Sequence, residues 1–303
     1  MSTIGITGGT GLIGTHISKL LLSKGYDVII FTRGGNKVNE KLQYAHWDPS
    51  KNECDIESVK KLDAVINLAG AGIADKRWTA KRKKEIEDSR VQGTTFLIST
   101  LKEHARSCNI FIGASAIGFY GTDSIPPVAF TENSPHAEDF LGNTCMQWEE
   151  AEIQASTFLR TVIFRFGIVL SKEGGAYTKF AHPQSFGIVP ILGNGKQIIS
   201  WIHIYDLCNM LLFAMENSPI NGIFNAVAPK PVSNKELMKM IAKEKGGIKI
   251  LLPVPSFVLK IMLGEMSEEV LKSTTINAGK IINAGFSFKF NTIPDAVKDL
   301  ETQ

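Results

Sequence analysis

Short apolar stretches alternate with longer ones in which apolar residues recur at helical spacing over the first 166 residues. Strands are predicted at 4–7, 28–31, 44–47, 64–70, 110–114 and 162–166. Continuous apolar runs are typical of parallel strands buried on both faces, and the spacing between them predicts helices at 12–24, 79–101 and 140–156. This alternation predicts an α/β fold built on a doubly wound parallel sheet.

The pattern changes after Gly167, where Gly174, Gly175 and Pro183 interrupt it. Beyond them we expect a strand at 198–204, a helix headed by Asp206, and a short strand at 222–226 that returns to the main sheet. A capping box at 233–236 opens a further helix, and residues 257–263 form an apolar helix. We therefore predict a dinucleotide-binding domain at 1–170, with a returning segment near 198–228, and a smaller C-terminal α/β substrate or lid domain at 171–303.

Three glycines mark the junction between the first strand and the first helix. Gly8 permits a tight turn, Gly11 lets a phosphate approach the backbone, and Gly14 lets the helix pack closely on the sheet. The amides at such a helix start are unpaired and carry partial positive charge, which suits a pyrophosphate. The position of these glycines predicts a nucleotide-binding fold of the Rossmann type.

The end of the second strand indicates which dinucleotide binds. NAD-binding folds usually place an acid there for the ribose hydroxyls, whereas Arg accommodates the 2′-phosphate of NADP. Here Thr32 and Arg33 follow the strand without an acid. We predict NADP in preference to NAD; the alternative is that Arg33 is a surface arginine. Because parallel strands end at one edge, the strand-end residues should line one crevice: Gly8, Thr32, Leu68, Ser115 and Gly167.

Composition argues against several other classes of protein. The net charge of +3 is small, and acidic residues follow the local basic cluster at 76–84 at once, so a nucleic-acid partner is not expected. No apolar run reaches the length of a membrane span. The four cysteines show no metal-ligand spacing, so no metal site is expected. We expect a cytoplasmic monomer or homodimer that acts on a small molecule.

The motifs together resemble one family, the extended short-chain dehydrogenases/reductases, which include nucleotide-sugar epimerases. The resemblance begins with the stretch at 7–14 and continues at 67–70 and 115–121. It narrows to an epimerase-like subfamily with its own C-terminal domain through the motifs at 165–170, 174–175, 193–197, 200–203, 225–229, 264–266 and 285–286. It covers nearly the whole chain and implies an NADP-binding protein.

The resemblance also implies a set of cofactor contacts. Glu85 and Arg90 belong to it only by position in the family, because by themselves they are exposed helix charges. The complete set is Gly8, Gly9, Thr10, Gly11, Leu12, Ile13, Gly14, Thr32, Arg33, Leu68, Ala69, Gly70, Glu85, Arg90 and Ile168.

The catalytic signature of the wider family is absent. Its members use Tyr-x-x-x-Lys with a Ser or Thr, because a nearby ammonium group favours the phenolate of a tyrosine whose usual pKa is near 10. None of the five tyrosines has a lysine four residues later, and Leu141 and Cys145 occupy the corresponding positions. The sequence therefore departs from standard epimerase chemistry.

Ser115, Tyr120 and His203 remain as catalytic candidates. Ser115 is placed to hold a substrate oxygen, Tyr120 to donate a proton, and His203 to act as an acid or base. Each also has a structural interpretation: a strand-end cap, a loop aromatic and a hydrogen-bonded core histidine. Two functions stay open: an NADP-dependent oxidoreductase or epimerase-like enzyme on a small polar or nucleotide-linked substrate, and a non-catalytic NADP-binding sensor or scaffold.

Overall fold

The computed structural model describes residues 2–34, 37–39 and 41–302. In this part of the chain a nine-stranded sheet is ordered β13-β8-β7-β6-β1-β2-β4-β3, with β5 paired to β4. Every pair is parallel except those that β3 and β5 form with β4. The strands are β1 Thr3–Thr7, β2 Asp27–Thr32, β3 Lys37–Asn39, β4 Leu42–Asp48, β5 Glu53–Cys54, β6 Ala64–Asn67, β7 Ile110–Ala116, β8 Arg160–Phe166 and β13 Gly222–Ala226.

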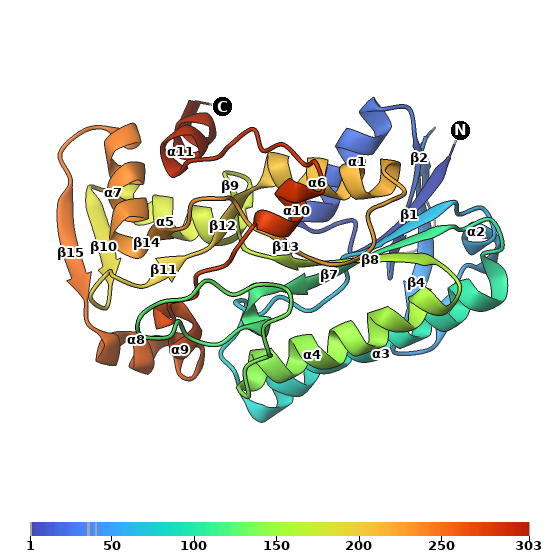
Figure 1. Ribbon diagram of the computed structural model, residues 1–303, viewed down its shortest axis with the longest axis horizontal. Coiled ribbons are helices and arrows are strands. Elements are labelled where there is room, and N and C mark those ends of the chain that lie inside the picture. The colour runs from blue at the N-terminus through green and yellow to red at the C-terminus, as the bar shows by residue number, and fades with distance from the viewer. Residues whose placement is uncertain (1, 35–36, 40, 303) are drawn as a thin grey trace.

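Helices cover both faces of this sheet (Figure 1). The face toward α1 and α6 buries Ile6, Val28 and Leu211, and the face toward α3 buries Ile29, Val65 and Leu101. Strand residues thus alternate between two apolar layers, as expected for a sheet buried on both sides. The helices are α1 Leu12–Ser23, α2 Ile56–Val59, α3 Ala80–His104, α4 Phe140–Ile153 and α6 Ile204–Glu216, with 3₁₀ turns η1 Ile117–Phe119 and η2 Gln154–Thr157.

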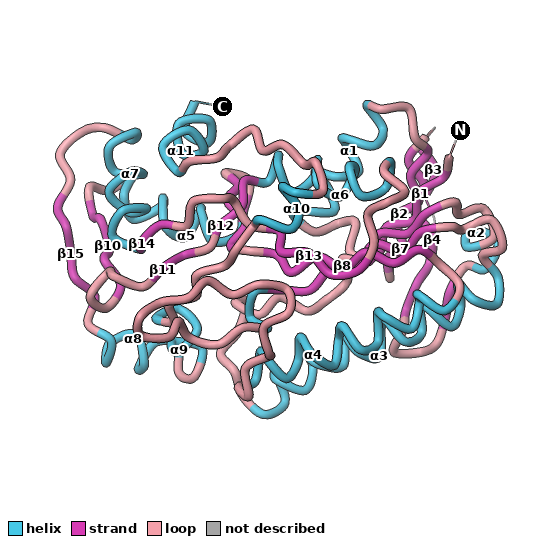
Figure 2. Tube along the Cα trace, in the orientation of Figure 1, coloured by secondary structure: helices cyan, strands magenta, loops and turns pink. Residues whose placement is uncertain are grey.

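The C-terminal part packs at one end of the main sheet around a second core (Figure 2). Its two-stranded sheets pair β10 with β15, β11 with β14, and β12 with β9. The strands are β9 Ile168–Ser171, β10 Ile188–Leu192, β11 Ile198–Ile199, β12 Trp201–His203, β14 Val232–Ser233 and β15 Ile250–Val254. The helices are α5 Gly175–Ser185, α7 Asn234–Lys245, α8 Ser256–Leu263, α9 Met266–Leu271, α10 Gly279–Asn283 and α11 Ile293–Thr302.

Most of the predicted elements are confirmed. The doubly wound parallel sheet is present, and β13 returns to it beside β8. Thr79 caps α3, and Ser233 forms the predicted capping box with Glu236. No helix in the described ranges is both long enough and apolar enough to cross a bilayer. The boundary between the two predicted domains stays a prediction.

Two predictions about residues 198–216 are wrong. The expected single strand at 198–204 divides at Ser200, because its hydroxyl donates to Thr274 O and accepts from the Ile276 N–H. Strand β11 then pairs with β14 and strand β12 with β9. Helix α6 is capped by His203 and not headed by Asp206, whose carboxylate instead accepts the N–H groups of Lys289 and Phe290.

Gly14 should tolerate no side chain. A Cβ there would lie within 3.0 Å of Gly8 O and Gly9 Cα, which real Cβ atoms essentially never do. Gly14→Ala should lower the free energy of unfolding of the cofactor-free protein by about 1–3 kcal/mol, as overpacking does. Gly11→Ala is the matched control, because its Cβ meets only Gly8 O at 3.3 Å. Urea unfolding measures both; equal stability of the two variants would contradict this account.

Candidate functional site

The turn from β1 to α1 is held against the end of β6 by backbone contacts. Gly8 has φ +66°, and a Cβ at this position would lie 2.5 Å from Leu68 O. Gly11 occupies the N-cap of α1 in extended conformation, where it offers no side chain to the first helical amides. The exposed Thr10, the buried Gly9 and the half-buried Leu12 and Ile13 complete the turn. The geometry leaves the start of α1 open to an anion.

The end of β2 carries a positive charge at the same edge of the sheet. Arg33 is exposed, and Thr32 accepts the Gly34 N–H at 3.3 Å. The neighbouring carboxylate of Asp48 is held by the N–H and hydroxyl of Ser50. Hydrogen bonding to Ser50 lowers the pKa of Asp48, and the charge of Arg33 adds to this effect. The arrangement suits a ligand phosphate beside Arg33.

The end of β6 and helix α3 supply the next part of the crevice. The Leu68 N–H donates to Thr7 O, and Ala69 and Gly70 continue the strand end. The Arg90 guanidinium lies directly beneath Gly70, where it donates to Ala71 O and stacks 5.1 Å from the Trp148 ring centroid. Burial lowers the pKa of Arg90. The contacts of Arg90 with Gly70 and Ala71 thus place its guanidinium at the end of β6.

Glu85 and Ile168, the remaining two predicted cofactor contacts, form their contacts with α3 and with Ser200. Glu85 is exposed on α3 and forms an ion pair at 2.7 Å with Arg82, a neighbour on the same helix. Ile168 opens β9, and its N–H donates to Ser200 O. The loop that follows β9 approaches the glycine turn, because a Cβ on Gly174 would lie 3.6 Å from Leu12. The roles of Glu85 and Ile168 toward a cofactor stay predictions.

A buried ion pair lies behind the ends of β7 and β8. Arg165 binds both carboxylate oxygens of Glu149, at 2.8 and 2.7 Å. Ser115 donates to Glu149 Oε1 at 2.6 Å, and Arg165 donates to the Tyr120 hydroxyl at 2.8 Å. Tyr120 in turn donates to Asn225 Oδ1 at 2.6 Å. All five residues are buried; we call them the buried polar network.

The network engages two of the three catalytic candidates. The protons of the Ser115 and Tyr120 hydroxyls are both donated to protein acceptors. Burial raises the pKa of Tyr120 to about 12, although Arg165 and Asn225 oppose this. Cys145 lies one turn before Glu149 on α4, and burial raises the pKa of its thiol to about 12. These groups are therefore neutral near pH 7.

His203 contacts Tyr205, Asp299 and Phe290, none of which belongs to this network. Its Nδ1 accepts the Tyr205 N–H, and its Nε2 is 3.5 Å from Asp299 on α11. Its ring packs on Phe290 with centroids 4.0 Å apart. Burial lowers the pKa of His203 to about 4, so it is neutral at physiological pH. The structure thus brings Ser115 and Tyr120 together and places His203 at the start of α6.

Glu149 and Asn225 are site residues that the sequence analysis missed. A signal for Glu149 exists, because Arg165 interrupts an apolar buried strand and a buried charge requires a partner. Glu149 also follows Cys145 by one helical turn, so it shares a helix face with the position where the wider family has lysine. Asn225 has no comparable signal, because it meets Tyr120 across 105 residues of sequence.

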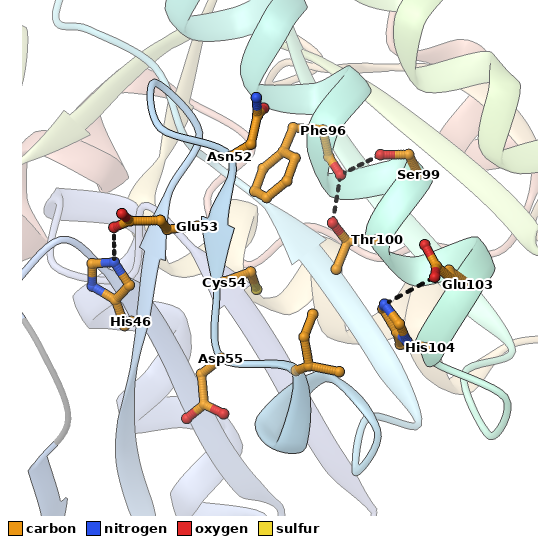
Figure 3. A pocket seen from close by; sticks show the side chains of 11 residues that line it. His46, Asn52, Glu53, Cys54, Asp55, Phe96, Ser99, Thr100, Glu103 and His104 are labelled. Atoms are coloured by element: carbon orange, nitrogen blue, oxygen red, sulfur yellow. Dashed lines mark hydrogen bonds and ion pairs between the residues drawn. The ribbon is translucent and has the colours of Figure 1, made fainter.

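A separate groove of about 500 Å³ lies between β5 and the C-terminal half of α3 (Figure 3). Cys54 and Phe96 line it, while His46 is 3.0 Å from Glu53 and His104 is 3.6 Å from Glu103. Within the described ranges no cluster of three or more His, Cys, Asp or Glu could hold a metal ion. The groove shares no residue with the glycine turn or the buried polar network.

The parallel strand order and the glycine turn define a dinucleotide-binding protein of the Rossmann type. More specifically, the chain belongs to the NAD-dependent epimerase/dehydratase family, whose model matches residues 4–226. A domain of unknown function, DUF1731, matches residues 254–300. The resemblance stated from the motifs is thereby confirmed.

Relatives and solved structures agree with this assignment. Epimerase family protein YfhF of Bacillus subtilis is 36% identical over 98% of this chain and 97% of its own length. The SDR39U1 homologue of Arabidopsis thaliana is 33% identical over 98% of this chain and 86% of its own. The structure of human SDR39U1, described with NADPH, has a TM-score of 0.86, 26% identity and 99% coverage of both chains.

Breaking the ion pair of the buried polar network should destabilise the protein strongly. Arg165→Met leaves Glu149 buried without its cation, and such losses amount to about 3–5 kcal/mol. The double variant Arg165→Met/Glu149→Leu should recover part of this loss, because no unpaired charge remains. Lys84→Met, which breaks the exposed pair with Asp88, is the control and should change the free energy of unfolding by less than about 1 kcal/mol.

Denaturant unfolding of the four proteins tests this prediction. A loss for Arg165→Met no larger than that for Lys84→Met would show that the pair contributes no more than a surface ion pair.

Proposed function

We propose that this protein binds NADP(H) in preference to NAD(H) and uses it in oxidoreductase or epimerase-like chemistry on a small polar or nucleotide-linked substrate. The observation that carries the proposal is the β1–α1 turn: Gly8 and Gly14 let its backbone pack closely, and Gly11 at the N-cap leaves the start of α1 without a capping side chain. Arg33 at the end of β2 supports the preference for NADP. The NADPH of the human relative supports it further.

Each part of the cofactor would meet a distinct part of the chain. The amides at the start of α1 would hold the pyrophosphate, and the guanidinium of Arg33 would pair with the 2′-phosphate. The small Ala69 and Gly70 would let the dinucleotide cross the end of β6. When bound, the nicotinamide supplies or accepts a hydride. The chain's own residues then have to bind and orient the substrate.

Ser115 is suited to one of these tasks. Its single hydroxyl proton is donated to Glu149, so its oxygen offers only lone pairs to any further partner. A substrate hydroxyl can donate to such an oxygen, whereas a carbonyl cannot. This polarity favours the alcohol form of a substrate at Ser115. We also propose that the partner is a small molecule and that the protein is cytoplasmic. The four cysteines are free, which suits the reducing conditions of that compartment.

A second candidate function is NADP(H) binding without turnover, as in a sensor or scaffold. The resemblance places Leu141 and Cys145 where the wider family has Tyr and Lys. The observation that favours this second function is that the nearby hydroxyls of Ser115 and Tyr120 both donate to acceptors within the buried polar network. With the thiol of Cys145 neutral, the position that the resemblance gives to the family lysine carries no positive charge.

The cofactor preference should depend on Arg33. Arg33→Ala should lower the affinity for NADPH by about 10- to 100-fold, the range for a lost hydrogen bond to a charged group, and leave NADH affinity nearly unchanged. Titration calorimetry with both cofactors measures the ratio. Arg106→Ala, an exposed arginine between α3 and β7, is the control. If the ratio of NADPH affinity to NADH affinity is unchanged in Arg33→Ala, Arg33 does not bind the 2′-phosphate.

Turnover separates the two functions. The protein is incubated with NADPH and a panel of carbonyl compounds and sugar nucleotides while the absorbance of NADPH is followed. For an enzyme, Ser115→Ala should slow the active substrate by about tenfold or more, and Thr100→Ala, which removes a buried hydroxyl on α3, should not. Tight NADPH binding without turnover of any panel member, in wild type and variants alike, would favour the sensor.

A further inference from the structure

Arg90 is a half-buried cation that forms no ion pair with any described residue. Its Nη1 donates to Ala71 O at 3.1 Å and to Ile86 O at 3.0 Å, but its Nε and Nη2 donate to no acceptor in the described ranges. Arg160 shows the contrast, because its Nη1 and Nη2 together donate to four backbone carbonyls around the C-terminal end of α6. Arg90 therefore keeps donors at Nε and Nη2 for a ligand oxygen.

The guanidinium of Arg90 is fixed in place by its packing. A Cβ on Gly70 would lie 3.0 Å from its Cζ, and Cζ is 5.1 Å from the centroid of the Trp148 ring. Arg90 lies on α3 and Trp148 on α4, and these two helices run side by side (Figure 1). A planar guanidinium held in this way loses little conformational freedom when it binds a further group.

The strand order indicates which half of a dinucleotide would pass Arg90. Strand β1 lies between β2 and β6 in the sheet. With the pyrophosphate at the start of α1, after β1, and the 2′-phosphate at Arg33, after β2, the adenosine half lies toward β2. The ribose and nicotinamide of the other half then have to cross the end of β6. Arg90 lies at this end, so it faces the nicotinamide half.

Cys145 is the residue of α4 that matters most to this cation. It lies one turn before Trp148, whose ring Arg90 contacts, and so shares a helix face with it. Burial raises the pKa of the Cys145 thiol, and the charge of Arg90 opposes this rise. The two groups therefore interact electrostatically. A lysine at position 145, where the resemblance places one, would bring a second cation to Arg90.

We propose that Arg90 binds the ribose hydroxyls of the nicotinamide half of NADP(H) and supplies from α3 the positive charge that a lysine at position 145 would supply from α4. This inference rests on the proposed function, because it requires the same cofactor. The free donors at Nε and Nη2 suit hydroxyl oxygens, which accept hydrogen bonds. Since a guanidinium keeps its proton in proteins, Arg90 orients the cofactor and adds a fixed charge but transfers no proton.

Truncated ligands test where Arg90 binds. Both 2′-phospho-ADP-ribose and 2′-phospho-ADP carry the 2′-phosphate and the pyrophosphate, but only the first has the second ribose. Arg90→Gln should weaken the binding of NADPH and 2′-phospho-ADP-ribose by about 10- to 100-fold, the range for hydrogen bonds to a charged group. It should leave 2′-phospho-ADP nearly unchanged. Arg33→Ala is the matched control, which should weaken both truncated ligands alike. Titration calorimetry measures all these affinities.

A double-mutant cycle tests the exchange of charge between α3 and α4. Cys145→Lys alone should weaken NADPH binding by about threefold or more, because it brings two cations together. In the Arg90→Gln background the same change should strengthen binding by a similar factor, which is within the range of couplings between contacting residues. A purely structural role of Arg90 would not reverse the sign of this effect. Urea unfolding checks that the variants fold, and if Cys145→Lys does not, the truncated ligands decide alone.

The outcomes separate this inference from the proposed function. If Arg90→Gln weakens both truncated ligands equally, or neither, the inference is wrong, while NADPH binding that depends on Arg33 would still support the proposed function. A folded Cys145→Lys that weakens NADPH binding equally in both backgrounds would overturn the exchange of charge. A wild type that binds none of the three ligands would contradict the proposed function and the inference together.

Discussion

The buried ion pair between Arg165 and Glu149 is the interaction on which the crevice side of this structure depends. Burying two charges is costly unless the remaining donors and acceptors are satisfied. Here the guanidinium binds both carboxylate oxygens and also donates to Tyr120, and its Cζ atom lies 3.5 Å from the Phe119 ring centroid. Because these partners come from β7, β8, α4 and the loop after β7, satisfying one pair fixes the relative positions of all these segments.

The same pair limits the chemistry available to the chain. A hydroxyl that satisfies a buried carboxylate is held in one orientation, and this orientation determines whether it can donate to a ligand. In relatives that use Tyr-x-x-x-Lys, a charged group beside the phenol shifts the tyrosine toward phenolate. In this protein the cation that contacts the Tyr120 phenol is Arg165, which also forms an ion pair with Glu149. Tyr120 therefore gains a hydrogen bond from Arg165, while burial still keeps the pKa of its phenol high.

The sequence predicted the parts of this structure that depend on local pattern. The parallel strands, the glycine turn and the capping box with Glu236 each follow from residues close together in the chain. The misjudged parts depend on distant partners. Ser200 divides a strand because it meets Thr274, and Asp206 lies in the first turn of α6, after the His203 N-cap, where it binds the amides of Lys289 and Phe290. For the same reason Ser115 was recognised as a strand-end hydroxyl, but its partner Glu149 was not.

Cofactor binding and proton transfer rest on separate physical requirements in this fold. The glycine turn depends on the absence of Cβ atoms at Gly8 and Gly14, and both meet backbone of the turn itself or of the β6 end. Nothing in that packing involves α4. The two α4 residues that the resemblance aligns with the family's Tyr and Lys, Leu141 and Cys145, can therefore differ from that pair without disturbing the start of α1. A chain that keeps the turn keeps the means to hold a dinucleotide, whatever proton chemistry α4 provides. This separation explains why the turn supports the binding proposal more strongly than it supports any particular reaction.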